Sequence, residues 1–171
     1  MRARAALAAA VGCTALALGG CGALEREAVT VPTVTRPAAT GPVLDAATFR
    51  AQADAACSRL YDALDGLGQP PTSDIAAARA YYPQVADAWH RMLDAAAALR
   101  PPPDLAAKWD EIVEAYRSIT QNADENVLLA GTDREAIEIV NSDASARSQE
   151  AGGFTIATAA TIGLRACAGE R

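Results

Sequence analysis

The chain has 171 residues and a formal net charge of −6, and 51% of its residues are hydrophobic. This length suits one modest domain with a core of its own. An acidic chain repels nucleic acid and anionic lipid headgroups, so neither is an expected partner.

The N-terminal residues have the layout of a secretory signal. Arg2 and Arg4 precede an uncharged, apolar stretch from Ala5 to Leu18, and the small residues Gly19 and Gly20 follow it. A basic start, an apolar stretch of roughly 7–15 residues and small residues at a cleavage site are typical of signal peptides. An uncleaved membrane helix is the alternative, because the uncharged run approaches the ~20 residues needed to span a bilayer. Its alanine- and glycine-rich composition disfavours insertion.

The four residues Leu18-Gly19-Gly20-Cys21 resemble the lipobox of bacterial lipoproteins. The resemblance implies that residues 1–20 are removed and that the thiol of Cys21 is acylated. Two acyl chains, such as palmitate, provide the two hydrophobic anchors that stable membrane binding requires. We therefore expect a lipid-anchored protein on the outer face of the cytoplasmic membrane. Loss of Arg2 and Arg4 would leave it with a net charge of −8.

The remaining cysteines predict a disulfide. Cys13 lies in the segment to be removed and Cys21 carries lipid, which leaves Cys57 and Cys167. An exported protein reaches an oxidising compartment, where such a pair forms a disulfide. Two buried, reduced thiols are the alternative. No metal site is expected, because two cysteines and one histidine do not complete a zinc shell.

Residues 21–44 show no helical period. Pro32, Pro37 and Pro42 are interleaved with threonines, a composition that favours extended, solvated backbone. We expect this segment to be a tether between the lipidated Cys21 and a domain over residues 45–171. A glycosylated stalk is the alternative.

From Asp45 onward, apolar residues recur at helical spacing, and prolines and glycines separate four segments. Asp45 is the expected N-cap of the first helix. Thr72 or Ser73 is the expected cap of the second, and Pro83 inside it predicts a kink or two helical pieces. The expected core positions of these two helices are Phe49, Ala53, Cys57, Leu60, Leu64, Ile75, Tyr82, Val85, Trp89, Met92, Ala96 and Leu99.

Three prolines at 101–103 separate the second helix from a third, which is expected from about Asp104 to Gly131. Thr132 and Glu135 have the spacing of a capping box for the fourth helix. The apolar positions of that helix change their helical phase at two glycines, residues 152–153. We expect a bend or local unwinding there. The expected core positions of these helices are Leu105, Trp109, Ile112, Tyr116, Ile119, Ala123, Ile137, Val140, Ala144, Ala151, Ile156, Ala160, Gly163 and Cys167.

Four amphipathic helices joined by short turns predict an all-α fold, an up-down-up-down four-helix bundle. In that topology the last helix lies beside the first. Cys57 and Cys167 are both on expected core faces, so their disulfide would join these two helices.

No catalytic constellation is evident, and neither a phosphate-binding loop nor a nucleophile elbow is present. His90 is the only histidine, which rules out a di-iron bundle site, and we expect it on the surface, paired with Asp87 or Asp94. We expect several carboxylates to lie on solvated helix faces, and a weak cation site is the alternative. They are Asp110, Glu111, Glu114, Glu135 and Glu138. Core positions, rather than a ligand site, are expected for Trp89, Trp109, Tyr116 and Phe154.

One run of polar residues, from Asn141 to Gln149, is unusual for a helix that packs. Together with the glycine pair that follows, it is the expected position of a polar cleft or a mobile segment. An exposed, poorly packed stretch is the alternative. No ligand-binding residue is assigned from the sequence.

The lipobox, the tether, the Phe49-x₇-Cys57 spacing, the proline turn and the closing Gly163-Leu164-x-x-Cys167 together resemble small exported helical lipoproteins of actinobacteria. The resemblance implies a subcellular location and a fold, and it implies no catalytic residue or cofactor. We expect a non-enzymatic envelope lipoprotein that presents a surface to a protein partner or ligand. A carrier of a small apolar or lipidic ligand between its helices is the alternative. An enzyme would require Asp87, His90 and carboxylates of the third helix to converge in one pocket.

Overall fold

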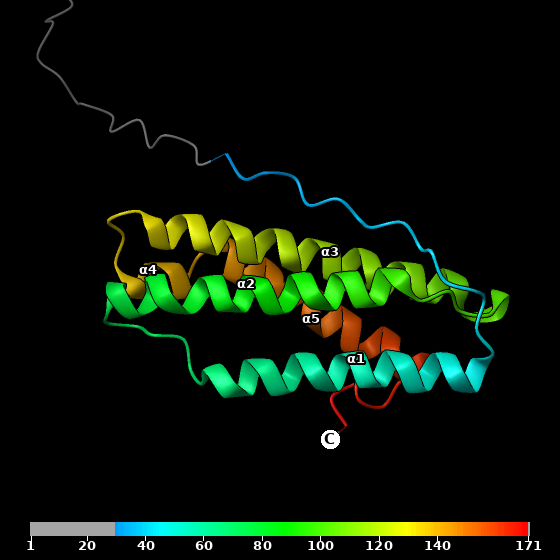
Figure 1. Ribbon diagram of the computed structural model, residues 1–171. Coiled ribbons are helices and arrows are strands. Elements are labelled where there is room, and N and C mark those ends of the chain that lie inside the picture. The colour runs from blue at the N-terminus through cyan, green and yellow to red at the C-terminus, as the bar shows by residue number, and fades with distance from the viewer. Residues whose placement is uncertain (1–29, 171) are drawn as a thin grey trace, which may run out of the picture.

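Five helices make up the part of the protein that the computed structural model describes, residues 30–170 (Figure 1). They are α1 (Ala46–Leu67), α2 (Ile75–Ala98), α3 (Pro103–Gly131), α4 (Ala136–Val140) and α5 (Asp143–Thr161). No β-strand forms within residues 30–170, where only an isolated bridge joins Val43 to Arg100. The predicted all-α class is confirmed.

The longest helix, α3, packs against both α2 and α5, while α1 packs against α2. Figure 1 shows α1, α2 and α3 side by side, with α5 behind them and running obliquely toward α1. Few contacts join α1 to α5 directly. The expected packing of the last helix along the first is therefore not found, and the segment that follows α5 makes the connection instead.

The starts of α1 and α2 are both fixed by aspartates. The carboxylate of Asp45 accepts hydrogen bonds from two backbone N–H groups of the first turn of α1, as predicted. The cap of α2 is Asp74, so the prediction of Thr72 or Ser73 is wrong. A carboxylate suits this position because it binds the free N–H groups and complements the positive end of the helix dipole.

The helix α2 is one continuous element although Pro83 lies inside it. Proline has no N–H to donate to the preceding turn. The missing donor affects the carbonyl of Arg79, four residues back; the neighbouring Ala80 carbonyl accepts a hydrogen bond from the Gln84 side-chain amide at 2.8 Å. Pro83 itself is exposed, so its ring does not disturb the core. The alternative of two helical pieces is wrong.

The expected fourth helix is two helices, α4 and α5, which separate at Asn141 and Ser142. The Ser142 hydroxyl accepts a hydrogen bond from the Ser145 N–H and caps α5. Serine favours such positions because its hydroxyl replaces the missing helical partner of the backbone. Gly152 and Gly153 lie inside α5, so the chain unwinds ten residues earlier than predicted.

The predicted capping box at Thr132 and Glu135 is wrong. The Thr132 hydroxyl donates to the Leu129 carbonyl at 2.6 Å, at the end of α3. Glu135 precedes α4 and makes no side-chain cap. Thr132 therefore closes one helix instead of opening the next.

A large hydrophobic core surrounds Phe49 and Trp109, whose rings meet edge to face with their centroids 5.0 Å apart. The indole N–H of Trp109 donates to the Ala96 carbonyl at 3.2 Å, which satisfies this buried polar group. Trp109 and Tyr116 are buried, as predicted. A second, smaller cluster lies toward the other end of α2 and α3 and contains Ala78, Tyr82, Ala130, Ala136 and Ile139.

Three large hydrophobic residues that were expected in the core, Ile137, Phe154 and Ile156, are exposed, and so are the expected core positions Ala160 and Gly163. The break at 141–142 accounts for Phe154 and Ile156, because it resets the helical phase of α5 relative to α4, whereas Ile137 precedes the break on the exposed side of α4. The buried positions of this region are Ala136, Ile139, Ala144, Thr155, Thr158 and Ala159. The helix α5 therefore buries small and polar residues and presents larger apolar ones to solvent.

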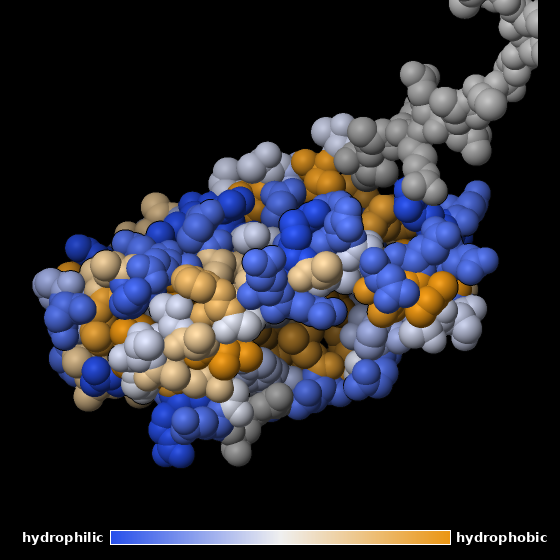
Figure 2. Space-filling view, turned by 180° about the vertical axis from the view of Figure 1, so that it is seen from behind, coloured by the Kyte–Doolittle hydropathy of each residue, from blue (hydrophilic) through white to orange (hydrophobic). Residues whose placement is uncertain are grey.

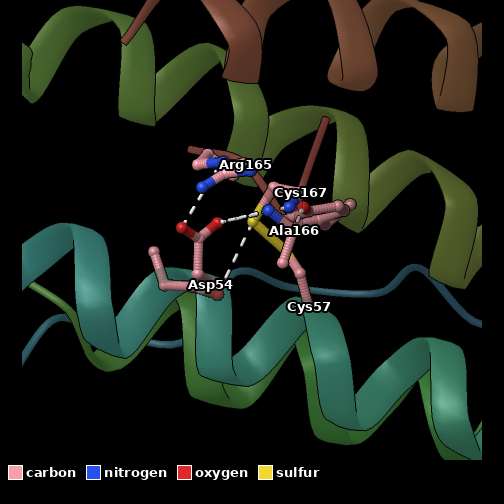
Figure 3. The surroundings of a disulfide bond; sticks show 7 residues. Asp54, Cys57, Arg165, Ala166 and Cys167 are labelled. Carbon is pink, nitrogen blue, oxygen red and sulfur yellow. Dashed lines mark hydrogen bonds between the residues drawn. A yellow bond between two sulfur atoms is a disulfide. The ribbon is translucent and has the colours of Figure 1, made fainter. Parts of the chain in front are cut away.

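The predicted disulfide pair is present, since Cys57 of α1 is bonded to Cys167 (Figure 3). Cys167 does not lie on the last helix, as the sequence pattern suggested, but in the turns that follow Thr161. Gly163 allows this turn with a φ of +73°, a region that other residues rarely adopt. The chain thereby leaves the axis of α5 and reaches α1.

The carboxylate of Asp54 on α1 holds the C-terminal turn beside the disulfide (Figure 3). It accepts hydrogen bonds from the backbone N–H groups of Arg165, Ala166 and Cys167, at 3.2, 2.9 and 3.3 Å. Three donors converging on one carboxylate form a small anion-binding nest. The disulfide is thus supported by a polar clamp on the same two segments.

Residues 30–44, which we name the strap, contain no helix, as their proline content predicts. The strap is not detached from the domain, however, and lies along α3 (Figure 1). Val34 and Leu44 are half-buried and pack against the large core. Within this range the expected tether is therefore part of the domain surface.

Candidate functional site

The only histidine lies on the surface but not with its expected partners. His90 Nε2 on α2 lies 3.0 Å from Asp124 Oδ1 on α3. Asp87 forms an ion pair with Arg91 instead. The packing of α2 against α3 brings Asp124 to the imidazole, a contact that spacing along one helix does not reveal. Between residues 30 and 170, no three His, Cys, Asp or Glu side chains are grouped to hold a metal ion.

The acidic residues on the outer face of α3 are solvated, as predicted, and are paired with basic neighbours. Glu111 pairs with Lys108 at 2.9 Å and Glu114 with Arg117 at 2.7 Å. The hydrogen bond from Arg117 lowers the pKa of Glu114, and partial burial opposes this effect. Exposed pairs of this kind contribute little to stability.

A network of polar side chains fills the junction between α3 and the break that precedes α5. The amide of Asn126, which is buried on α3, donates to the Ser145 hydroxyl at 3.2 Å and accepts from the Ser142 hydroxyl at 2.9 Å. The Ser145 hydroxyl donates in turn to the Ile139 carbonyl at 3.0 Å. Hydrogen bonds therefore fix the cap of α5 to α3.

Arg147 of α5 extends this network along α3. Its Nε donates to Asn122 Oδ1 at 3.1 Å, and its Nη2 lies 2.5 Å from Glu125 Oε2. Asn122 is only 4% exposed, and its Nδ2 has no hydrogen-bond partner among the protein groups. A buried, unpaired N–H group costs about 1–3 kcal/mol. The α3–α5 contact is therefore less stable than an apolar contact of the same size.

Two surface cavities adjoin the network, and each is lined by one partner of the Arg147–Glu125 ion pair. The first has a volume of about 530 Å³ and is lined largely by polar side chains, including Glu125, Asn141 and Ser142. The second has a volume of about 640 Å³ and lies between α3 and α5. We name it the α3–α5 groove. Its apolar lining is Ala115, Ala151 and Phe154, and its charged lining includes Arg117, Arg147 and Glu150.

Phe154 distinguishes the α3–α5 groove from the first cavity, because it adds an aromatic ring that is 47% exposed, whereas the apolar lining of the first cavity is aliphatic. Figure 2 shows the side of the molecule opposite to that of Figure 1, where hydrophobic residues lie among hydrophilic ones and the surface is hollowed. An exposed aromatic ring beside small apolar residues and within a charged rim is the composition of binding hot spots. The groove is the site that this arrangement defines.

The sequence indicated the polar network but not the α3–α5 groove, because Phe154 was expected in the core. The polar run 141–149 predicts a polar cleft, and the network and the first cavity lie there. The contribution of α3 to the network was missed, although Asn126 lies where the predicted stripe through Ile119 and Ala123 continues. A polar residue in line with a predicted core stripe was the available signal.

These features define an all-helical domain with one disulfide and a mixed polar and apolar groove. No protein-family model, curated protein or solved structure matches the chain. Between Thr30 and Glu170, no helix combines the length and the apolar character needed to cross a bilayer. Cys13 and Cys21, with the whole of the expected signal sequence, lie outside the described residues.

Proposed function

We propose that the mature protein is a non-enzymatic envelope lipoprotein, anchored by Cys21 to the outer face of the cytoplasmic membrane, that binds a protein partner in the α3–α5 groove. Residues 1–20 are removed, and the four long helices of the domain alternate in direction, with the C-terminal turn instead of α5 joined to α1. The observation that carries this proposal is the exposure of Phe154 within the groove.

The groove suits a partner that inserts one apolar side chain between α3 and α5. Phe154, Ala115 and Ala151 offer an apolar contact, while the guanidinium groups and carboxylates around them offer charged contacts to a polar rim. Burial of an aromatic side chain from water is the largest single contribution in many interfaces. The charged groups then favour one orientation of the partner.

The anchor is supported by the basic start, the apolar stretch and the lipobox-like residues Leu18-Gly19-Gly20-Cys21. The disulfide between Cys57 and Cys167 suits an oxidising compartment. Intact-mass measurement of protein from its own membrane tests this part. The expected mass is that of residues 21–171 with a diacyl group, and Cys21→Ala should release the protein from the membrane. An intact methionine end or an unmodified thiol at position 21 would refute the anchor.

The groove is tested by photo-cross-linking in native membranes, with a photoreactive phenylalanine analogue at position 154. One specific cross-linked protein is expected, and its purified form should bind the wild-type domain and lose affinity about tenfold for Phe154→Ser. Ile156→Ser is the matched control, because Ile156 is equally exposed on α5 but does not line the groove. Equal losses for both variants would indicate a non-specific apolar surface and refute the groove.

A carrier of a small apolar or lipidic ligand is the second candidate. A cavity of about 320 Å³ beneath the strap favours it, because Leu99, Ala106 and Val43 line this space. Its volume is at the lower end of the range of ligand pockets. Analysis of the natively purified protein for bound lipids by mass spectrometry tests the carrier, which predicts one ligand at a fixed stoichiometry.

A further inference from the structure

We propose that the strap has two positions, docked on α3 and released, and that docking sets how far the α3–α5 groove can lie from the membrane. This regulation of the groove rests on the proposed function, because it requires the anchor at Cys21. The inference comes from the contacts that hold the strap.

One glutamine side chain binds the strap backbone at two points. The Gln121 amide donates from Nε2 to the Pro32 carbonyl at 2.9 Å and accepts at Oε1 from the Val34 N–H at 2.6 Å. The amide of a glutamine thus takes the place of a neighbouring strand, since it pairs with one donor and one acceptor of an extended backbone. In the N-terminal part of the strap, only Val34 packs against the core. The contact between Gln121 and the strap is therefore mainly polar and can be broken and formed again.

Further contacts fasten the strap closer to α1. Arg36 forms an ion pair with Asp110 at 2.7 Å, with both side chains partly exposed. The Leu44 N–H donates to the Arg100 carbonyl at 2.9 Å, just before α1 begins. Exposed ion pairs are weak. The strap is therefore held at both ends, by Gln121 near Pro32 and by Arg100 next to α1.

Docking shortens the free tether. When Pro32 is bound, ten residues separate Cys21 from the domain, and they reach at most about 31 Å at ~3.1 Å per residue. When the strap is released up to α1, residues 22–44 are free and reach about 71 Å. The two positions therefore place the groove close to the membrane or allow it to extend outward.

Arg117 connects the strap to the groove. Its Nη1 donates to the Val34 carbonyl at 3.3 Å, and the same side chain lines the α3–α5 groove beside Glu114. A partner that draws Arg117 into the groove would weaken its bond to the strap. By the reciprocity of coupled equilibria, release of the strap then favours binding of that partner.

The test uses the mature, lipidated protein in phospholipid vesicles. Hydrogen exchange of the Val34 amide reports docking, and energy transfer from a fluorescent amino acid at Ser118, in the groove, to a labelled lipid reports distance. Gln121→Ala should accelerate Val34 exchange about tenfold, since two hydrogen bonds are lost. It should also lower the energy transfer about twofold, because the free tether lengthens. Gln121→Glu keeps the acceptor for Val34 but loses the donor to Pro32, so an intermediate exchange rate is expected.

Gln84→Ala is the control, because Gln84 makes its hydrogen bond within α2 and does not touch the strap. It should change neither measurement. Equal exchange of Val34 in the wild type and Gln121→Ala would overturn the docking, and unchanged energy transfer in a released strap would overturn its control of distance. Failure of the anchor is recognised separately, because a protein without lipid leaves the vesicles while Val34 stays protected.

Discussion

Around the first half of α1, Phe49 and Trp109 pack in a large apolar core and the Cys57–Cys167 disulfide closes the chain. At the junction of α3, α4 and α5, by contrast, Asn126 and two serines carry the contact, and Asn122 retains an unpaired N–H group. The first region combines burial and a covalent bond, whereas the second depends on hydrogen bonds near solvent. The groove lies beside the second, where lower local stability allows the surface to adjust to a partner.

The largest expected effect separates the two phenylalanines of the chain. Phe49→Ala should lower the free energy of unfolding by about 3–5 kcal/mol, because Phe49 is fully buried against Trp109. Phe154→Ala should change it by less than about 0.5 kcal/mol, because Phe154 is half exposed. Urea denaturation of both variants measures the difference. Similar losses for the two would contradict the assignment of Phe154 to a surface groove.

Removal of the disulfide is the next largest effect. Cys57→Ser and Cys167→Ser should each lower stability by about 2–4 kcal/mol, since 110 positions separate the two residues and the unfolded chain loses a long constraint. The double variant should be no less stable than either single variant. Denaturation under non-reducing conditions measures this, with the reduced wild type as reference. Additive losses would show that the two thiols act independently.

A smaller, local effect is expected in the polar region. Asn126→Ala should cost about 1–2 kcal/mol, because it leaves the Ser142 and Ser145 hydroxyls without their partner on α3. Hydrogen exchange should become faster in α4 and the start of α5 and remain slow around the disulfide. Asn141→Ala, at an exposed neighbouring position, is the control. Faster exchange throughout the domain would mean that the two regions unfold as one unit.

The smallest effect is a dependence of stability on alkaline pH. Burial, and to a lesser extent the charges of Tyr61 and Asp54, raises the pKa of Tyr116, whose hydroxyl lies 3.3 Å from Cys57 Sγ. A raised pKa in the folded state means that the contribution of Tyr116 is complete below pH about 10 and is lost as the pH rises above it. Thermal unfolding between pH 8 and 11 should show this decline. Tyr116→Phe should reduce it, and an unchanged decline would place its origin elsewhere.

The core of the first three helices was predictable, because the positions of Phe49, Trp109 and Tyr116 follow a single uninterrupted helical phase. The region after Gly131 was not. A five-residue step in the apolar pattern was assigned to the glycine pair, whereas Ser142 interrupts the helix and caps a new one. Glycine permits unwinding but does not require it, and a satisfied cap decides the boundary.

The helical class, the limits of the first and third helices to within a few residues and the pairing of Cys57 with Cys167 were predictable from the amino-acid sequence. Helical spacing and the number of available cysteines contain that information. Three features emerged only from the folded structure: His90 meets Asp124, Gln121 binds the strap, and Phe154 faces solvent. These contacts join residues on different elements, and their geometry depends on how the helices pack.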